Sequence, residues 1–461
     1  MKSTRRDFLR HSVCAALGAG AMSGAIADLQ RVLAGTTASG GGSRQMTDYK
    51  ALVCIFLGGG NDSSNMLIPR GTGYGEYARQ RTILAVPQEN LLPIAPNTGD
   101  GREYGFHPSL TGLQNLFNTG KLAVLANVGA LAVPTTRAQF LSGSVPLPPS
   151  LFGHLEQTTH WQTSLVDQPP NTGWAGRTAD LMHSLNGDTP VSMNISIAGT
   201  NVFGTGSQVT PSFVSTAGTI SLGWYDDNPG TSDPNTVAIN QIMSLAENGS
   251  NLYEKEFARI KRRAIDNNRA LHTALDSAPP ITTVFPNTYL GQQLKMVARL
   301  ISARNGLGFR RQTFFCELNG FDTHFEQVVS HANSLAEVSQ AMTAFFNATA
   351  ELGVASDVTT FTASDFGRTY SRSTAGSEHG WGGHHLIMGG AVRGKDIYGQ
   401  VPILTIDGPD DSGAGRWIPT TSVDQYSATL ARWFGVGEST LPVILPNIGR
   451  FANSNLGFMN A

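Results

Sequence analysis

The sequence predicts an α/β fold with a largely parallel central sheet, and two observations carry this prediction. Short apolar runs such as TFFCEL (313–318) and VTTFT (358–362) have the length of buried strands and lead into polar loops. The segment between them, 334–352, has apolar residues at helical spacing and is followed by Gly353. A right-handed crossover makes two such strands parallel and places both following loops at one edge of the sheet.

The N-terminal segment is predicted to be an export signal that takes no part in the fold. TRRDFLR (4–10) is typical of a twin-arginine signal, and cleavage sites of the A-x-A kind stand at 25–27 and 32–34. We assign 1–34 to the signal and 35–47 to a flexible Gly/Ser-rich linker. The implied partner during export is the twin-arginine translocase, and the implied location is periplasmic or secreted.

Composition limits the classes of partner. The chain has 461 residues, a formal net charge of -2 and 14% charged residues, so we expect no nucleic-acid partner. After the signal no apolar run is long enough to cross a bilayer, and no transmembrane segment is expected in the mature chain. Cys54 and Cys316 lie in apolar runs and are expected to be buried and free, with a disulfide as the alternative. Residues 48–461 are predicted to form a single domain.

The first half of the mature chain reads as strands that alternate with helices. ALVCIFL (51–57) is a buried strand that stops at a Gly-rich loop. A helix at 108–119 leads to a second strand, LAVLANV (122–128). After a Pro-rich turn, LFGHLEQTTHWQT (151–163) is predicted to be a helix whose N-terminus points back toward the sheet.

The middle of the chain has a different composition. Residues 191–223 alternate small, polar and β-branched residues with many glycines, which indicates strands or an inserted subdomain (about 191–250) lying over the site rather than new sheet core. Helical periodicity then returns at 237–247, 253–278 and 288–305.

Two loops after predicted strands carry candidate metal ligands. Asp322 and His324 are two residues apart, so in extended geometry both can face one ion. The alternative is a turn in which Asp322 caps the next helix and His324 lies on the surface. Asp365 also has helix capping as its alternative. Arg368 is either a salt-bridge partner or a fork that holds a substrate oxyanion.

Further candidates come from two Gly-rich segments. Asp62 follows three glycines, which permit close approach of the backbone to a ligand, although a plain tight turn is the rival interpretation. His379, His384 and His385 lie in a segment predicted to be an irregular loop before the apolar 386–388. In an exported protein such a cluster indicates a metal, with some members acting as hydrogen-bond partners of the ligands.

These motifs together resemble a known family. They are the TRRDFL leader (4–9), GGND (59–62), GFDTH (320–324), SDFGRT (364–369), EHGWGG (378–383) and IPTTSVDQY (418–426). They are similar to domain-of-unknown-function family 1501, a group of twin-arginine-exported bacterial proteins related to the alkaline phosphatase and sulfatase superfamily. The resemblance covers nearly the whole mature chain. It implies a three-layer α/β/α sandwich and one or two divalent ions, a pair standing about 4 Å apart.

The resemblance also implies a set of ligands. Imidazoles favour Zn²⁺, with Ca²⁺ or Mn²⁺ as alternatives. The implied metal ligands are Asp62, Asp322, His324, Asp365 and His379, with His385 as the less favoured alternative to His379.

This sequence departs from the superfamily pattern in two ways. Alkaline phosphatases have Asp-His where this chain has Asp365-Phe366, so one ligand of the second metal is missing. The nucleophile is also unassigned: Ser150 occupies a comparable place before a helix, with Ser144 and Thr136 as rivals and a simple N-cap as the alternative role. The absence of a Cys-x-Pro-x-Arg motif argues against a formylglycine sulfatase.

The resulting hypothesis is an exported metal-dependent hydrolase of phosphate or sulfate esters, with a small molecule or a polymer as substrate. A serine or hydroxide attacks, while Arg368 and Asn65 hold non-bridging oxygens. His154 and Gln157 either line the same cleft or are ordinary helix-surface residues. The rival hypothesis is a non-catalytic exported binding or assembly protein that keeps the fold.

Overall fold

The computed structural model describes residues 48–219, 223–226, 228 and 230–460. The predicted export signal and linker lie outside these residues. From Tyr49 onward the chain forms one compact unit. In the described part of the chain, no helix has the combination of length and apolar character needed to cross a membrane.

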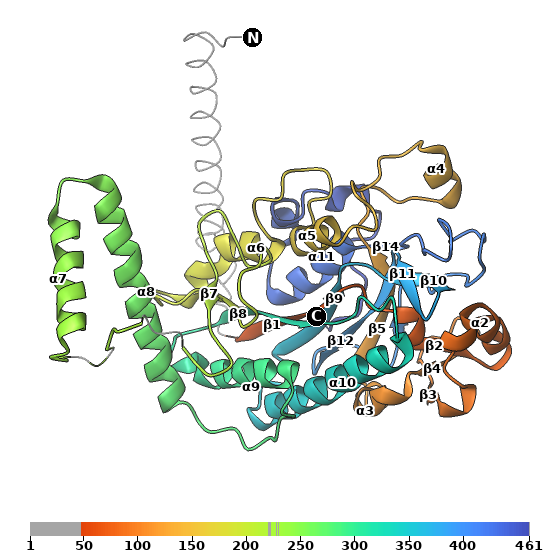
Figure 1. Ribbon diagram of the computed structural model, residues 1–461, viewed down its shortest axis with the longest axis horizontal. Coiled ribbons are helices and arrows are strands. Elements are labelled where there is room, and N and C mark those ends of the chain that lie inside the picture. The colour runs from red at the N-terminus through yellow and green to blue at the C-terminus, as the bar shows by residue number, and fades with distance from the viewer. Residues whose placement is uncertain (1–47, 220–222, 227, 229, 461) are drawn as a thin grey trace, which may run out of the picture. The chain divides into compact units, whose positions relative to one another are not determined.

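A mixed sheet of nine strands forms the centre of this unit, as far as the described residues show (Figure 1). The strand order is β13-β5-β12-β9-β1-β8-β6-β7, and β14 pairs with β5. In chain order the strands are β1 (Lys50–Gly58), β5 (Leu122–Gly129), β6 (Asn194–Ser196), β7 (Ser212–Phe213), β8 (Arg311–Asn319), β9 (Val358–Ser364), β12 (Gly383–Gly389), β13 (Ile397–Tyr398) and β14 (Thr421–Ser422).

The predicted crossover is confirmed. β1 lies between β8 and β9 and pairs with both in parallel, and α10 (Gln327–Glu351) connects β8 to β9. Because the strands are parallel, the loops that follow all three meet at one edge of the sheet. The helix begins seven residues before the predicted 334, because 327–333 continue it without an interruption.

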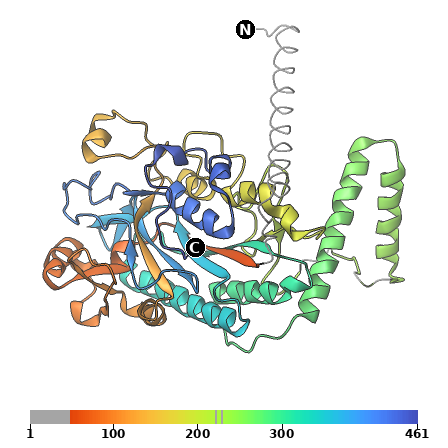
Figure 2. The same ribbon diagram turned by 180° about the vertical axis from the view of Figure 1, so that it is seen from behind.

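Helices cover both faces of the sheet and form the predicted three-layer sandwich (Figures 1 and 2). α3 (Thr111–Asn118), α9 (Tyr289–Ser302) and α10 lie on one face. α5 (His154–Thr163), α6 (Trp174–Met182) and α11 (Val423–Phe434) lie on the other. The remaining α-helices of the described residues are α2 (Tyr74–Arg81), α4 (Arg137–Ser142), α7 (Pro234–Asn248), α8 (Leu252–Ser277) and α12 (Leu441–Ile444).

Two small sheets stand beside the large one. One has the order β2-β4-β3, and the other is the antiparallel pair β10-β11. Their strands are β2 (Leu67–Arg70), β3 (Leu92–Ile94), β4 (Glu103–Phe106), β10 (Arg368–Ser373) and β11 (Gly376–His379).

Two sequence predictions about strands are wrong. The Gly-rich middle segment does contribute to the sheet core, because buried β6 pairs with β8 in parallel. The histidine-rich segment is not an irregular loop: His379 ends β11, and His384 and His385 lie in β12, which is antiparallel to both β5 and β9. Gly380 and Gly382 lie between these two strands, and a Cβ at Gly382 would lie 2.0 Å from the side-chain oxygen of Asn127.

Buried histidines determine how this fold responds to acid. Burial lowers the pKa of His331 and His384 to about 4 and that of His385 to about 3. In the unfolded chain a histidine titrates near 6.5, so below that pH the unfolded state binds more protons than the folded state. The stability that these neutral rings contribute is complete above about pH 6.5 and is lost as the pH falls toward the folded-state pKa values.

We therefore expect the free energy of unfolding to fall by roughly 3 kcal/mol per buried histidine between pH 7 and pH 4. Urea denaturation at a series of pH values measures this. A His331→Gln variant should show a shallower dependence, whereas replacement of His272, whose side chain is 63% exposed, should leave the slope unchanged. A stability that does not vary over this pH range would contradict the prediction.

Candidate metal centre

Glycines bring the three central strands close together at the carboxyl edge. Gly59 has φ +112°, and a Cβ there would lie 2.3 Å from the backbone nitrogen of Asp322. Its own N–H donates to Asp365 Oδ1 at 3.0 Å. The close neighbour of this glycine is therefore the loop after β8. A side chain at position 59 would push Asp322 out of place.

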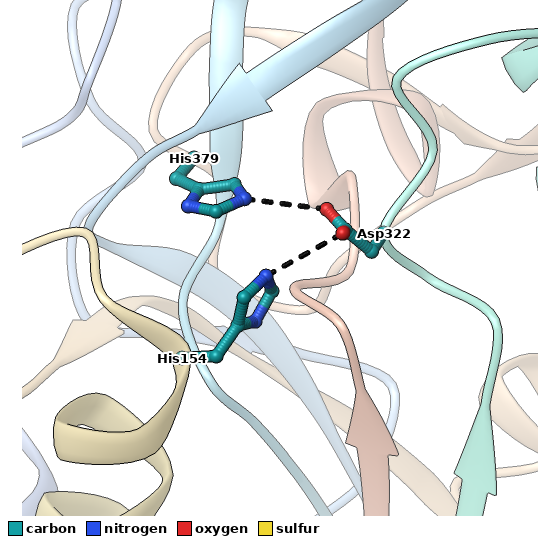
Figure 3. Close-up of side chains that lie close together, drawn as sticks. All are labelled: His154, Asp322 and His379. Carbon is teal, nitrogen blue, oxygen red and sulfur yellow. Dashed lines mark ion pairs between the residues drawn. The ribbon is translucent and has the colours of Figure 1, made fainter.

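Three imidazoles converge on Asp322, and Figure 3 shows two of them, those of His154 and His379. Its Oδ2 lies 3.5 Å from His154 Nε2, and its Oδ1 lies 3.3 Å from His379 Nε2 and 3.0 Å from His324 Nε2. One ligand atom each from His154, Asp322 and His379 lie within 4.8 Å of one another. His324 Nε2 is also 3.2 Å from His379 Nε2. We call His154, Asp322, His324 and His379 the histidine cluster.

In each imidazole of this cluster, Nδ1 lies within hydrogen-bonding distance of an oxygen atom. Nδ1 lies 2.6 Å from Asp365 Oδ2 in His154, 3.1 Å from Glu378 Oε2 in His324 and 2.7 Å from the Phe152 carbonyl oxygen in His379. Carboxylates and carbonyls only accept, so Nδ1 is the protonated nitrogen in each ring. In the neutral ring, the Nε2 lone pair then points at Asp322. This arrangement is the usual one for histidines that bind metal ions in proteins.

Charges around the cluster set its protonation. Partial burial raises the pKa of Asp322, but the hydrogen bond and charge of Arg368 outweigh burial and leave it below the ordinary value. The hydrogen bond to Asp365 raises the pKa of His154, whereas burial lowers the pKa of His379. At neutral pH Asp322 is therefore ionised and His379 is neutral.

Arg368 lies beneath the cluster and is fully buried. Its Nη1 donates to Asp322 Oδ1 at 2.6 Å and to the Gly59 carbonyl at 3.1 Å, and the other side of the guanidinium binds Ser377. Of the two roles predicted for this residue, the structure therefore shows the salt bridge. Its effect is to fix the orientation of the Asp322 carboxylate.

Asp62 is directed into the protein, although sequence reasoning assigned it as a metal ligand. Its side chain has no exposed surface, and Oδ2 accepts from Arg81 and Gln327. Oδ1 is buried and has no hydrogen-bond partner among the described residues. The guanidinium compensates the charge of this carboxylate, and Asp62 is not part of the group of metal-ligand atoms that comes together among the described residues.

Three other predicted residues also make internal contacts. The Asn65 amide lies between the Tyr77 hydroxyl and the Leu84 carbonyl, each at 2.8 Å, so both of its ends are used. The ring of His385 packs against Trp161 in the core, with centroids 4.5 Å apart. Asp365 is 5% exposed and holds His154 and Gly59, so its contacts are those of a residue that orients a ligand.

Ser150 does not cap the helix that follows it. It is exposed and has φ +49°, and Phe152 has φ +72°. These left-handed residues delay the start of α5 to His154, with Gly153 as the N-cap, and the predicted start at 151 is wrong. The same turn directs the Phe152 carbonyl at His379. Of the rival nucleophiles, Thr136 is the N-cap of α4 and Ser144 hydrogen-bonds to Ser142 on the surface.

His154 is the member of the cluster that sequence reasoning did not identify as a ligand. The His154 and Phe366 rings lie 4.9 Å apart, and Phe366 stacks on His379 at 4.8 Å. An imidazole from α5 thus lies beside position 366, where the family resemblance implied a histidine. The position of His154 in the first turn of a helix after a strand was the available signal.

Removal of the Glu378 carboxylate tests whether the hydrogen bonds to Nδ1 of the imidazoles contribute to metal affinity. In a Glu378→Gln variant, His324 loses the anionic partner of Nδ1, and we expect metal affinity to fall about 10–100-fold. Titration with Zn²⁺ against a competing chelator measures this. Glu326→Gln, an exposed position two residues after His324, serves as the control. Equal affinities in the two variants would contradict the prediction.

Residues 237–412 match the model of a family described as "Protein of unknown function (DUF1501)". This segment is similar to the DUF1501 family. The match confirms the resemblance inferred from the sequence motifs. The DUF1501 segment contains Asp322, His324 and His379, whereas His154 lies before it.

Solved structures with a similar chain path include three bacterial proteins. The lipoteichoic acid synthase LtaP from Listeria monocytogenes is 6% identical, with a TM-score of 0.34 and coverage of 85% of this chain and 73% of that chain. The soluble domain of lipooligosaccharide phosphoethanolamine transferase A from Neisseria meningitidis is 11% identical, with a TM-score of 0.30 and coverage of 84% and 88%. BT1596, a 2-O GAG sulfatase, is 9% identical, with a TM-score of 0.32 and coverage of 87% and 75%. The sequence has no significant match among curated proteins.

Proposed function

We propose that this chain is an exported metal-dependent hydrolase of phosphate or sulfate esters, and that the histidine cluster holds its cation. The observation that carries the proposal is the convergence of three Nε2 atoms on Asp322 while an oxygen holds each Nδ1. Without a cation, three lone pairs and a carboxylate face one another. A positive ion removes that repulsion.

The donor set fits a borderline transition-metal ion. Imidazole nitrogen suits Zn²⁺ better than Ca²⁺ or Mn²⁺, which prefer oxygen ligands, so Zn²⁺ is the proposed ion. Among the described residues one group of donors comes together, and the Asp62 carboxylate is bound by Arg81. These contacts support one ion at this site rather than a pair.

The cluster is open to solvent and therefore to a substrate. The four side chains are between 27% and 43% exposed. A bound divalent cation supplies Lewis-acid stabilisation of negative charge on an ester oxygen. The protein contributes fixed ligands: Asp365, Glu378 and Phe152 hold the imidazoles, and Arg368 holds the carboxylate.

The attacking group is water or Ser150. Ser150 lies four residues before His154, on the exposed turn that also carries Phe152. A serine nucleophile leaves a covalent phospho- or sulfo-enzyme that mass spectrometry detects after a rapid quench, whereas direct attack by water leaves none. A Ser150→Ala variant with unchanged turnover would assign the attack to water.

The proposed location is the periplasm or the exterior of the cell, reached through the twin-arginine translocase. The TRRDFLR segment (4–10) supports this proposal. Replacement of Arg5 and Arg6 by Lys should retain the precursor in the cytoplasm. Export of this variant at the normal rate would refute the assignment.

Metal analysis together with an ester screen tests the proposed function. Protein purified from the exported fraction should contain a stoichiometric divalent metal and should hydrolyse at least one of an aryl phosphate, a phosphodiester and a sulfate ester. Protein that neither contains nor binds metal refutes the cluster as a metal site. Stoichiometric metal without turnover would favour the binding or assembly protein.

A further inference from the structure

α7 and α8 form a helical hairpin that stands away from the sheet (Figures 1 and 2). The C-terminal turns of α8 belong to the main core through Leu271 and Leu275. Farther out, the apolar contacts of α7 and α8 among the described residues are with each other and with Tyr225. This inner seam is a separate apolar cluster whose members are Ile239, Met243, Ala246, Ala258 and Ile265, with Tyr225 beside them.

The residues that immediately precede the seam residues form a second apolar stripe on each helix. On α7 they include Ile242 and Leu245, and on α8 they include Phe257. Tyr253 and Ile260 extend the α8 stripe at four- and three-residue spacing. These five side chains are between 46% and 86% exposed, although apolar side chains of this size are usually buried in a folded protein.

The residues that immediately follow the seam residues are polar. They include Ser244 and Glu247 on α7 and Arg259 on α8. Glu247 Oε1 binds Arg262 Nε at 2.7 Å and ties the two helices together on this side. The two helices are antiparallel. The residues that precede the seam residues therefore lie on the same face of the hairpin in both helices. The hairpin therefore has one apolar face and one polar face, like half of a four-helix bundle.

We propose that the apolar face of the α7–α8 hairpin is a dimerisation surface, on which the same face of a second copy packs to form a four-helix bundle. The face consists of Ile242, Leu245, Tyr253, Phe257 and Ile260, and Leu252 lies at its tip. A two-fold interface is self-complementary, which suits this largely apolar face. Lys261 borders it, with Nζ 5.4 Å from the centre of the Phe257 ring.

The available area supports a second copy as the occupant. The exposed parts of these six side chains amount to roughly 800 Å², about the area that each partner contributes to a stable interface of standard size. Phe257 lies between Tyr253 and Ile260 along α8, away from the tip, and interfaces gain most of their affinity near their centre. The proposal is independent of the histidine cluster, because the hairpin contributes no residue to it.

Sedimentation equilibrium of the purified full-length protein tests the proposal. We expect a dimer at micromolar concentration. Leu245→Glu and Phe257→Glu should each raise the dimer dissociation constant by more than about 100-fold. Ser244→Glu, on the polar face next to Leu245, is the matched control and should leave the dimer intact. Circular dichroism of each variant confirms that the helices are formed.

Several results would overturn the proposal. A wild-type monomer at 100-fold higher concentration would do so, as would a dimer that both apolar-face variants leave unchanged. A dimer that Ser244→Glu weakens as much as Phe257→Glu would place the interface elsewhere. A monomer that sediments with vesicles of anionic lipid through Phe257 would identify a membrane, rather than a second copy, as the occupant.

Discussion

An Asp322→Asn variant is expected to lose its metal and with it the ester hydrolysis that we propose. Asp322 is the carboxylate that faces the Nε2 atoms of His154, His324 and His379, and an amide supplies no charge to balance the cation. The loss of affinity should exceed the 10–100-fold that removal of an outer hydrogen-bond partner costs, so we expect more than about 100-fold. Metal content after dialysis and turnover on an aryl ester measure the two effects.

The control is Asp276→Asn, which removes an exposed carboxylate of α8 that pairs with His272. It should retain both metal and activity. Retention of both stoichiometric metal and full activity by Asp322→Asn would exclude Asp322 as a ligand. Loss of activity with metal retained would instead assign Asp322 a role in the reaction.

His154 allows a sharper version of the same test. His154→Ala should weaken metal binding, and a second change, Phe366→His, should restore part of it, because the rings at positions 154 and 366 are in contact. Phe366→Leu in the same background is the control for packing. Equal affinities with His and Leu at position 366 would show that the two positions are not interchangeable.

An Arg81→Met variant is expected to lower the free energy of unfolding by about 3–5 kcal/mol. Arg81 and Asp62 both have fully buried side chains, and the guanidinium also donates to the Thr369 and Tyr370 carbonyls at 3.0 and 3.1 Å. Its removal leaves a buried carboxylate with Gln327 as its remaining partner. Chemical denaturation measures the loss.

Two comparisons separate this ion pair from a general effect of substitution. Arg79→Met removes a surface ion pair with Glu76 and should cost less than about 1 kcal/mol. The double variant Arg81→Met with Asp62→Leu should be more stable than Arg81→Met alone, because no buried charge is then left unpaired. If Arg81→Met costs no more than Arg79→Met, the ion pair is not a stabilising contact.

The strands that carry the site could be predicted, because their signal is local. β1, β8 and β9 are apolar runs, and α10 has helical periodicity. Both kinds of pattern can be recognised without knowledge of distant residues. The same periodicity identified α7, α8 and α9. Asp322 and His324 were found for this reason, since they directly follow β8.

The rest of the site depends on contacts between distant segments. The sequence near Asp62 does not show that Arg81 forms an ion pair with it. It also does not show that the Arg81 guanidinium lies 5.7 Å from the ring of Tyr370. His379 was assigned to a loop because glycines surround it, although the turn between β10 and β11 makes it part of a hairpin. His154 required knowledge of how α5 lies against β9.

The path of the chain through the candidate centre has a consequence for work with fragments. The family segment, 237–412, contains β8 and β9 but not β1, the strand that lies between them. It also lacks α5, and with it His154. In a polypeptide cut to this segment, β8 and β9 would lack β1, the strand that pairs with both. It would also contain only two of the three histidines of the cluster. The smallest piece that can be assayed for metal binding therefore begins before β1, whatever the limits of the family.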